Sequence, residues 1–189
     1  MDPLGLFHAD RVRAREAQDP MAHLCTVANI DPNGRPQMRT LVLREVDGQL
    51  AVFINATSPK WPHVQTDVVL HTYWPSVQVQ YRMHVSASPV PQAIVHDSWH
   101  LRPDAPKKMD WFYEQHGVQS SGIGSRENLL EKLAAVELPE PLQAPDNARG
   151  LLLDPHEIER LDLTQPDGVH DRTLFKYSES TWHRETLVP

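Results

Sequence analysis

The feature that most constrains the fold is a strict alternation of apolar and polar residues over residues 77–88. The apolar set is Val77, Val79, Tyr81, Met83, Val85 and Ala87, and the polar set is Gln78, Gln80, Arg82, His84, Ser86 and Ser88. A period of two over 12 residues predicts a long strand with one buried face. The polar face has two readings. It meets water, as one side of an antiparallel sheet often does, or part of it lines a ligand cleft or a subunit interface.

A second pattern, over residues 34–60, predicts a β-hairpin. Residues 37–45 and 50–55 each have the composition of a strand, and an Asp-Gly dipeptide at 47–48 separates them. Asp-Gly is typical of the tight turn that joins two antiparallel strands. We therefore expect the two segments to pair directly.

Cations lie at both ends of this hairpin. Ser58 is able to cap a helix, with Pro59 at its first position. Arg39 lies on the first strand and Lys60 lies at the expected helix start. Two cations near a helix start are typical of a phosphate site.

The remaining segments predict more strands than helices. Helices are expected over residues 4–18, 91–101, 107–116 and 125–137, and strands over 21–30, 67–74, 150–153, 157–163, 172–177 and 181–187. This pattern indicates a mainly β fold with added helices, arranged as an antiparallel barrel. Residues 137–146 are proline-rich and predict an extended connector. The tail beyond them is short, so residues 1–189 are expected to form a single domain, with 147–189 returning to the same sheet.

Composition excludes several classes of protein. The formal net charge of −7 argues against a general nucleic-acid binder. The single cysteine, Cys25, allows no internal disulfide and fits a reducing compartment. The sequence has neither an apolar run of membrane-spanning length nor a secretory signal, so we expect a cytoplasmic protein.

Motifs for nucleophilic catalysis and for metal binding are weak. The sequence contains no GxSxG motif and no CxxC pair. His96 and His100 have the four-residue spacing of metal ligands on a helix, but no Glu or Cys accompanies them in an HExxH pattern. We therefore predict no metal site.

Five motifs occur in a recognisable order. They are Arg39-Thr-Leu-Val-Leu-Arg44, Asn55-Ala-Thr-Ser58-Pro-Lys60, Trp74 with Gln80, Gln119-Ser120-Ser121 followed by Ser125-Arg126, and His170-Asp171-Arg172 with Trp182, Leu187 and Pro189. Together they resemble the pyridoxamine 5′-phosphate oxidase family of flavin proteins, over roughly residues 21–189.

This resemblance implies an antiparallel split β-barrel that forms a homodimer with FMN between its subunits. Arg39 and Lys60 would hold the FMN phosphate, and Gln119 and Ser120 would reach the cofactor from the partner subunit. The other implied FMN-binding positions are Thr40, Leu41, Val42, Leu43, Arg44, Phe53, Ile54, Ser58, Gln80 and Arg172. His170 and Arg172 would be the catalytic residues on the substrate side, where a positive charge favours the reduced flavin.

The sequence departs from the family pattern mainly on the substrate side. Gly168 occupies the place of a substrate-binding Arg, Ser98 that of a phosphate-binding Tyr beside a matching Arg102, Arg160 and Leu161 a site for an aromatic, and Pro59 that of a basic residue. We therefore predict an FMN-dependent oxidase or reductase for a small molecule that stays unassigned. The alternatives are a true pyridoxamine or pyridoxine 5′-phosphate oxidase, and a non-catalytic flavin- or haem-binding protein.

Overall fold

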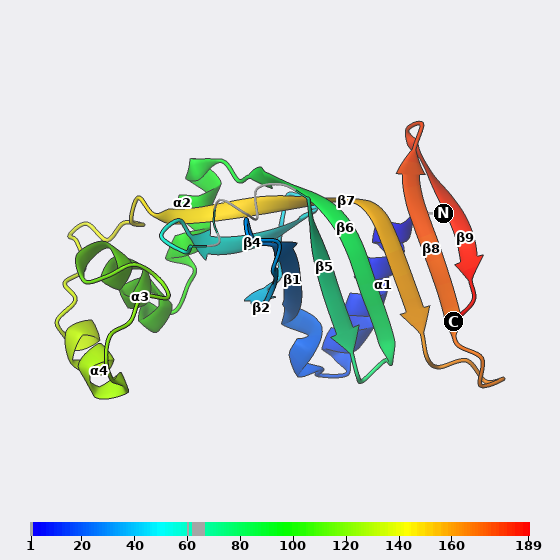
Figure 1. Cartoon of the computed structure of the whole chain (residues 1–189), viewed down its shortest axis with the longest axis horizontal. Helices are drawn as coiled ribbons and strands as arrows, with labels where there is room; N and C mark the ends of the chain where they lie inside the picture. The colour runs from blue at the N-terminus through cyan, green and yellow to red at the C-terminus, as the bar shows by residue number, and fades with distance from the viewer. Residues whose placement is uncertain (1, 60, 62–66) are drawn as a thin grey trace.

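The computed structural model describes residues 2–59, 61 and 67–189, and in these residues nine antiparallel strands form one sheet (Figure 1). The strand order is β2-β1-β5-β6-β7-β4-β3, and β8 pairs with β7 and with β9. The bounds are β1 Leu24–Ile30, β2 Pro36–Val42, β3 Arg44–Val46, β4 Gln49–Asn55, β5 Asp67–Trp74, β6 Val79–Pro89, β7 Ala148–Asp162, β8 Asp171–Ser178 and β9 Thr181–Leu187. The predicted mainly β, antiparallel class is confirmed.

The sheet curls into a barrel, because the edge strand β2 also contacts β4 near the other edge. Helix α1, Pro3–Glu16, packs against the inner face of β5 and β6. The ring of Phe7 lies 5.3 Å from that of Trp74 and 5.0 Å from that of Tyr81, measured between centroids. All three side chains are fully buried. Burying a large aromatic side chain contributes roughly 2–3 kcal/mol, so this cluster is a main source of stability.

A buried polar network fixes α1 to the sheet. One carboxylate oxygen of Asp10 accepts a hydrogen bond from the Tyr81 hydroxyl at 2.7 Å and another from Nε of Arg160 at 2.8 Å. The Arg160 guanidinium also reaches Asp162 at 3.1 Å. Burial and the neighbouring Asp10 raise the pKa of Tyr81. Every charge in this network has an opposite partner, which is the condition under which buried charges are tolerated.

The expected hairpin over residues 37–55 is only partly correct. The predicted strand over residues 37–45 is interrupted at Leu43. As a result β2 pairs with β1, and only the short β3 pairs with β4. Leu43 is buried, its N–H donates to the carbonyl of His23, and its carbonyl accepts from Arg11. These contacts carry the chain from one sheet edge to the other. The turn itself is confirmed, with positive φ angles at Asp47 and Gly48.

Strand β7 replaces two predicted short strands. It runs without interruption through Pro155, which lies opposite Val85 where the register with β6 shifts. A proline is tolerated at such a bulge because no ladder hydrogen bond is required there. The first part of β7 pairs with β4 and its last part with β8, so this one strand connects β4 to the β8–β9 hairpin.

Three helices follow β6: α2 Gln92–His100, α3 Asp104–Gln115 and α4 Arg126–Ala134. Helix α2 packs on β7, while α3 and α4 lie at one end of the long axis and the β8–β9 hairpin at the other (Figure 1). The helix expected after Ser58 falls mostly on residues outside the described part. Among the described helices, none has the length and apolar character needed to cross a membrane.

Candidate functional site

Arg39 points into a small cavity inside the barrel. The cavity has a volume of about 10 Å³ and is lined by Arg39 and seven apolar side chains, which are Val27, Leu41, Val52, Ile54, Val68, Leu151 and Leu153. In the described part of the chain, Nε and one terminal nitrogen of Arg39 are buried and have no hydrogen-bond partner. Burial lowers the pKa of this guanidinium. Buried polar nitrogens without a partner are costly, so Arg39 would gain from an anion that reaches them.

The cavity brings together three of the predicted cofactor residues, Arg39, Leu41 and Ile54. Its volume is close to the space that one water molecule needs, so it is far too small for a phosphate. An anion would therefore meet Arg39 only after its side chain turns out of the cavity.

The turn after β4 is held by hydrogen bonds that reach distant segments. Asn55 Oδ1 accepts from the backbone N–H of Thr57 at 2.9 Å and from its hydroxyl at 2.6 Å. Nδ2 of Asn55 donates to Oδ1 of Asn147 at 2.7 Å. The backbone N–H of Gln119 donates to the Thr57 hydroxyl at 3.1 Å. We call residues 55–58 with Gln119 the turn cluster; Lys60, the second predicted cation, lies outside the described residues.

The Gln119 loop also contacts its own chain. The backbone N–H of Gln119 bonds to Thr57, while the expectation that Gln119 and Ser120 reach the cofactor of a partner subunit stays a prediction. Ser120 follows in the same loop, with a positive φ angle of 71°. Ser58, in the turn that this loop contacts, is buried.

A second group of predicted residues lies in one row across three strands. Gln80 on β6 is opposite Leu161 on β7, and Leu161 is opposite Arg172 on β8. All three side chains are partly exposed. We call them the sheet row. Leu161 lies on the same face as Gln80 and Arg172, whereas Arg160 points to the other face of the sheet, toward Asp10.

Glu159 holds the arginine of this row in place. Its two carboxylate oxygens accept from Nε and from a terminal nitrogen of Arg172, each at 3.1 Å. The carboxylate also accepts from Arg82 at 2.6 Å. Glu159 is buried, and its hydrogen bonds raise the pKa of Arg172. The bidentate pairing fixes the plane of the guanidinium as well as its charge.

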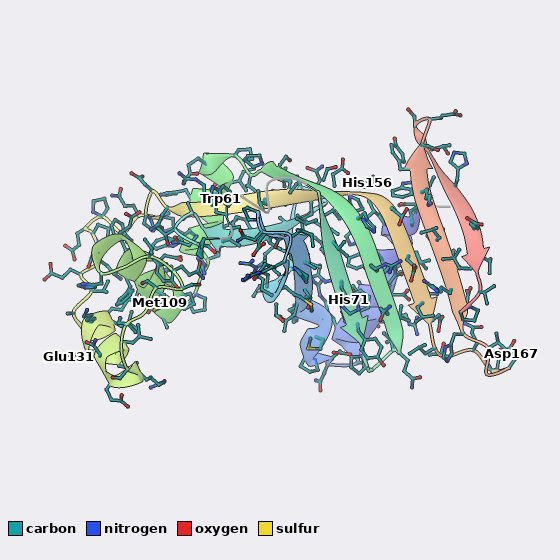
Figure 2. The ribbon with its side chains drawn as sticks, viewed as in Figure 1. Trp61, His71, Met109, Glu131, His156 and Asp167 are labelled. Carbon is teal, nitrogen blue, oxygen red and sulfur yellow. The ribbon has the colours of Figure 1, made fainter. Side chains whose placement is uncertain are left out.

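The other predicted positions are spread over both faces of the strands. His170 is exposed in the loop before β8, Leu43 is buried in the core, Thr40, Val42 and Arg44 are exposed, and Phe53 packs beside Gly150 on the face opposite Ile54. In Figure 2, Asp167 of the His170 loop lies at the opposite end of the molecule from Met109 and Glu131, which flank the Gln119 loop.

One chain does not bring the turn cluster and the sheet row together. Phe53, next to the turn cluster, is opposite Gly150, and Leu161 lies eleven residues further along β7. At 3.3 Å per residue that is up to about 35 Å along the strand. Arg39 and Arg172 lie five strand spacings apart, about 24 Å along the sheet, on opposite faces.

A third polar group lies beside the turn cluster. Asp110 of α3 forms an ion pair with Arg102 and accepts a hydrogen bond from the indole N–H of Trp99 at 2.9 Å. Asp110 is buried, and this burial raises its pKa. Neither Asp110 nor Glu159 was among the predicted site residues, since sequence spacing does not reveal pairs that form across strands and helices.

Comparisons with known proteins place this geometry in a family. No protein-family model matches the sequence. Pyridoxine/pyridoxamine 5′-phosphate oxidase of Haemophilus influenzae (strain 86-028NP) is 30% identical over 193 residues, spanning 100% of this chain and 90% of that protein. The enzyme of the same name from Pseudomonas entomophila is 29% identical over 198 residues, spanning 100% of this chain and 89% of that protein.

Two solved structures share the fold. PhzG from Burkholderia lata, in complex with tetrahydrophenazine-1-carboxylic acid, superposes with a TM-score of 0.83 at 21% identity, covering 100% of this chain and 93% of PhzG. A pyridoxamine 5′-phosphate oxidase-related, FMN-binding protein from Nostoc punctiforme gives 0.80 at 23% identity, covering 100% and 99% of the two chains.

The strand order and these structures define the molecule as a split barrel of the FMN-binding class, which confirms the predicted fold. Within that class, the chain belongs to the pyridoxine/pyridoxamine 5′-phosphate oxidase family.

Proposed function

We propose that the protein binds FMN and works as an oxidoreductase on a small molecule. We also propose that Arg102 does not bind a phosphate group of this substrate. The observation that carries the cofactor assignment is Arg39, two of whose guanidinium nitrogens are buried without a partner within the described residues. A phosphate of charge near −2 would supply that partner. Arg39 therefore fits the phosphate end of FMN.

We further propose a homodimer in which each site takes the turn cluster from one subunit and the sheet row from the other. The separation of about 35 Å along β7 supports this, because neither group is complete without the second. The outer face of β1 and β2 offers a contact surface, with Ile30, Met38 and Val42 exposed by 62%, 69% and 46%. Apolar side chains gathered on one face are typical of a subunit interface.

The roles of the protein groups follow from this arrangement. When bound, FMN supplies the hydride acceptor or donor. Arg172, held in a fixed plane by Glu159, places a positive charge beside the ring. Gln80 offers amide hydrogen bonds from the same row, and His170 lies on the exposed side, where a substrate would enter. These groups position the reactants and leave the electron transfer to the cofactor.

The substrate assignment rests on Arg102. Its guanidinium already pairs with the buried carboxylate of Asp110. Moving Arg102 to a substrate phosphate would leave that carboxylate buried and unpaired, at a cost of about 3–5 kcal/mol. Gly168 and Ser98 supply no charge in compensation. Oxidation of pyridoxamine 5′-phosphate is therefore the less favoured function.

The absorbance spectrum of the purified protein, recorded before and after addition of NADPH, tests the cofactor assignment. Flavin bands that bleach and then return with an acceptor support the proposal. A Soret band would indicate haem binding instead, and flavin that is never reduced would indicate a carrier. Hydrogen peroxide release at micromolar pyridoxamine 5′-phosphate would restore the oxidase assignment.

Subunit complementation tests the shared site. Arg39→Ala and Arg172→Ala proteins are each expected to lose FMN-dependent activity. In a refolded mixture, half of the dimers are mixed, and each contains one site without a substitution, so about a quarter of the wild-type activity should return. Mixing that restores nothing would show that one subunit supplies both arginines.

A further inference from the structure

Two histidines on α2 face each other at the surface of the helix. Nε2 of His96 lies 3.3 Å from Nε2 of His100, and the ring centroids are 4.5 Å apart with the planes at 60°. Nearly half of the His96 side chain is exposed, and His100 is partly exposed. The spacing of the two residues is visible in the sequence, and the structure adds that their two Nε2 atoms lie within hydrogen-bond distance of each other.

The separation of the two nitrogens matches that of two ligands on one metal ion. Zinc binds imidazole nitrogen at about 2.0–2.1 Å with tetrahedral angles, and this geometry puts two such nitrogens about 3.3–3.4 Å apart. A metal ion would therefore fit between His96 and His100 with little change in either ring. The alternative for the same distance is a hydrogen bond between two neutral rings, one donating and the other accepting.

Neighbouring contacts orient both rings. The His100 ring lies edge-on to Trp99, at 5.4 Å and 89°, and Trp99 is anchored by its hydrogen bond to Asp110. On the other histidine, Nδ1 of His96 faces the carboxylate of Asp97 at 3.8 Å. That distance is too long for a hydrogen bond, so the carboxylate favours a proton on Nδ1 only through its charge.

We propose that His96 and His100 form a two-histidine chelate for a divalent transition metal ion such as Cu²⁺, Ni²⁺ or Zn²⁺. No third His, Cys, Asp or Glu completes a group of three in the residues the structure describes. Water would therefore fill the remaining coordination positions, which stay open to an outside ligand. Metal binding here would not require FMN, although His100 contacts Trp99, whose hydrogen-bond partner Asp110 also pairs with Arg102.

Calorimetric titration of untagged protein with Cu²⁺ or Ni²⁺ tests this site. One ion per chain should bind at the pair, and either His96→Ala or His100→Ala should weaken its binding by at least about tenfold, because a chelate loses its second, intramolecular contact. His156→Ala removes an exposed histidine from β7 and is the matched control, with affinity expected to stay at the wild-type value.

Metal should also raise the melting temperature of the wild type, since it binds the folded helix, and should not do so in His96→Ala. Circular dichroism without metal establishes that each variant is folded. Equal affinity in the wild type and both single variants would overturn the proposal, as would a loss of affinity in His156→Ala of the same size. Equal affinity in all three proteins is the result expected if His96 and His100 only form a hydrogen bond with each other.

Discussion

Replacing Arg39 by methionine should stabilise the protein without cofactor while weakening its binding of FMN. Two nitrogens of Arg39 are buried without a partner in the described residues, among seven apolar side chains. Each unsatisfied buried polar group costs about 1–3 kcal/mol. Methionine keeps the unbranched stem and removes the charge, so a gain of about 2 kcal/mol in the free energy of unfolding is expected, after allowance for partial solvation of the guanidinium.

The two effects should be measured on separate samples. For a chain of this size, a gain of about 2 kcal/mol corresponds to a rise in melting temperature of about 4–8 °C. Urea unfolding of FMN-free protein gives the free energy directly. Loss of a charged hydrogen bond to phosphate costs about 1.5–3 kcal/mol, so the dissociation constant for FMN, followed by flavin fluorescence, should rise about 10- to 150-fold.

Arg35→Met is the matched control, because Arg35 is an exposed arginine just before the same strand. Both its stability and its FMN affinity should stay close to those of the wild type. If Arg39→Met instead destabilises the FMN-free protein, the guanidinium is satisfied in solution and the reasoning from its burial fails. If FMN affinity is unchanged, Arg39 does not hold the phosphate.

Three further predictions concern the buried charges and the thiol. Asp10→Ala should destabilise the protein by about 3–5 kcal/mol in urea unfolding, because it leaves Tyr81 and Arg160 without their shared acceptor, whereas Asp97→Ala, at an exposed site, should cost almost nothing. Asp110→Asn should release Arg102 and tighten the binding of pyridoxal 5′-phosphate by about tenfold, measured by absorbance; an unchanged affinity would contradict the role given to this ion pair. Burial raises the pKa of Cys25 to about 12, above its ordinary value of 9.0, so above pH 9 the unfolded thiol ionises while the folded one does not. Stability should therefore fall by about 1.4 kcal/mol by pH 10, a loss that Cys25→Ala should remove.

Local patterns predicted the strands well wherever one face of a strand is buried. The alternation over residues 77–88 became β6, and the limits expected for β5 and β9 match the structure. The error at Leu43 has a different origin. Its strand is interrupted by hydrogen bonds to His23 and Arg11, two residues from other segments. A local pattern carries no information about such partners.

In the candidate site, too, sequence motifs identify residues but not the partners that those residues meet on other strands. Arg39 and Gln80 could be named from motifs, but the face on which each side chain lies depends on register. Arg160 and Leu161 are neighbours in sequence, and only the alternation along β7 sends one toward Asp10 and the other into the row with Gln80. Glu159 was not predicted as a site residue, because its partners, Arg82 and Arg172, are on two other strands.

The arginines of the proposed site differ in how they are paired. Two nitrogens of Arg39 are buried without a partner in the described chain, so an anion from outside would satisfy them. Arg102 already pairs with the buried carboxylate of Asp110, whereas Arg172 shares the buried carboxylate of Glu159 with Arg82. A neutral or weakly charged substrate would leave both ion pairs intact, whereas a phosphate ester would have to displace one of them. The charge pattern of the fold therefore favours a phosphate on the cofactor and disfavours one on the substrate.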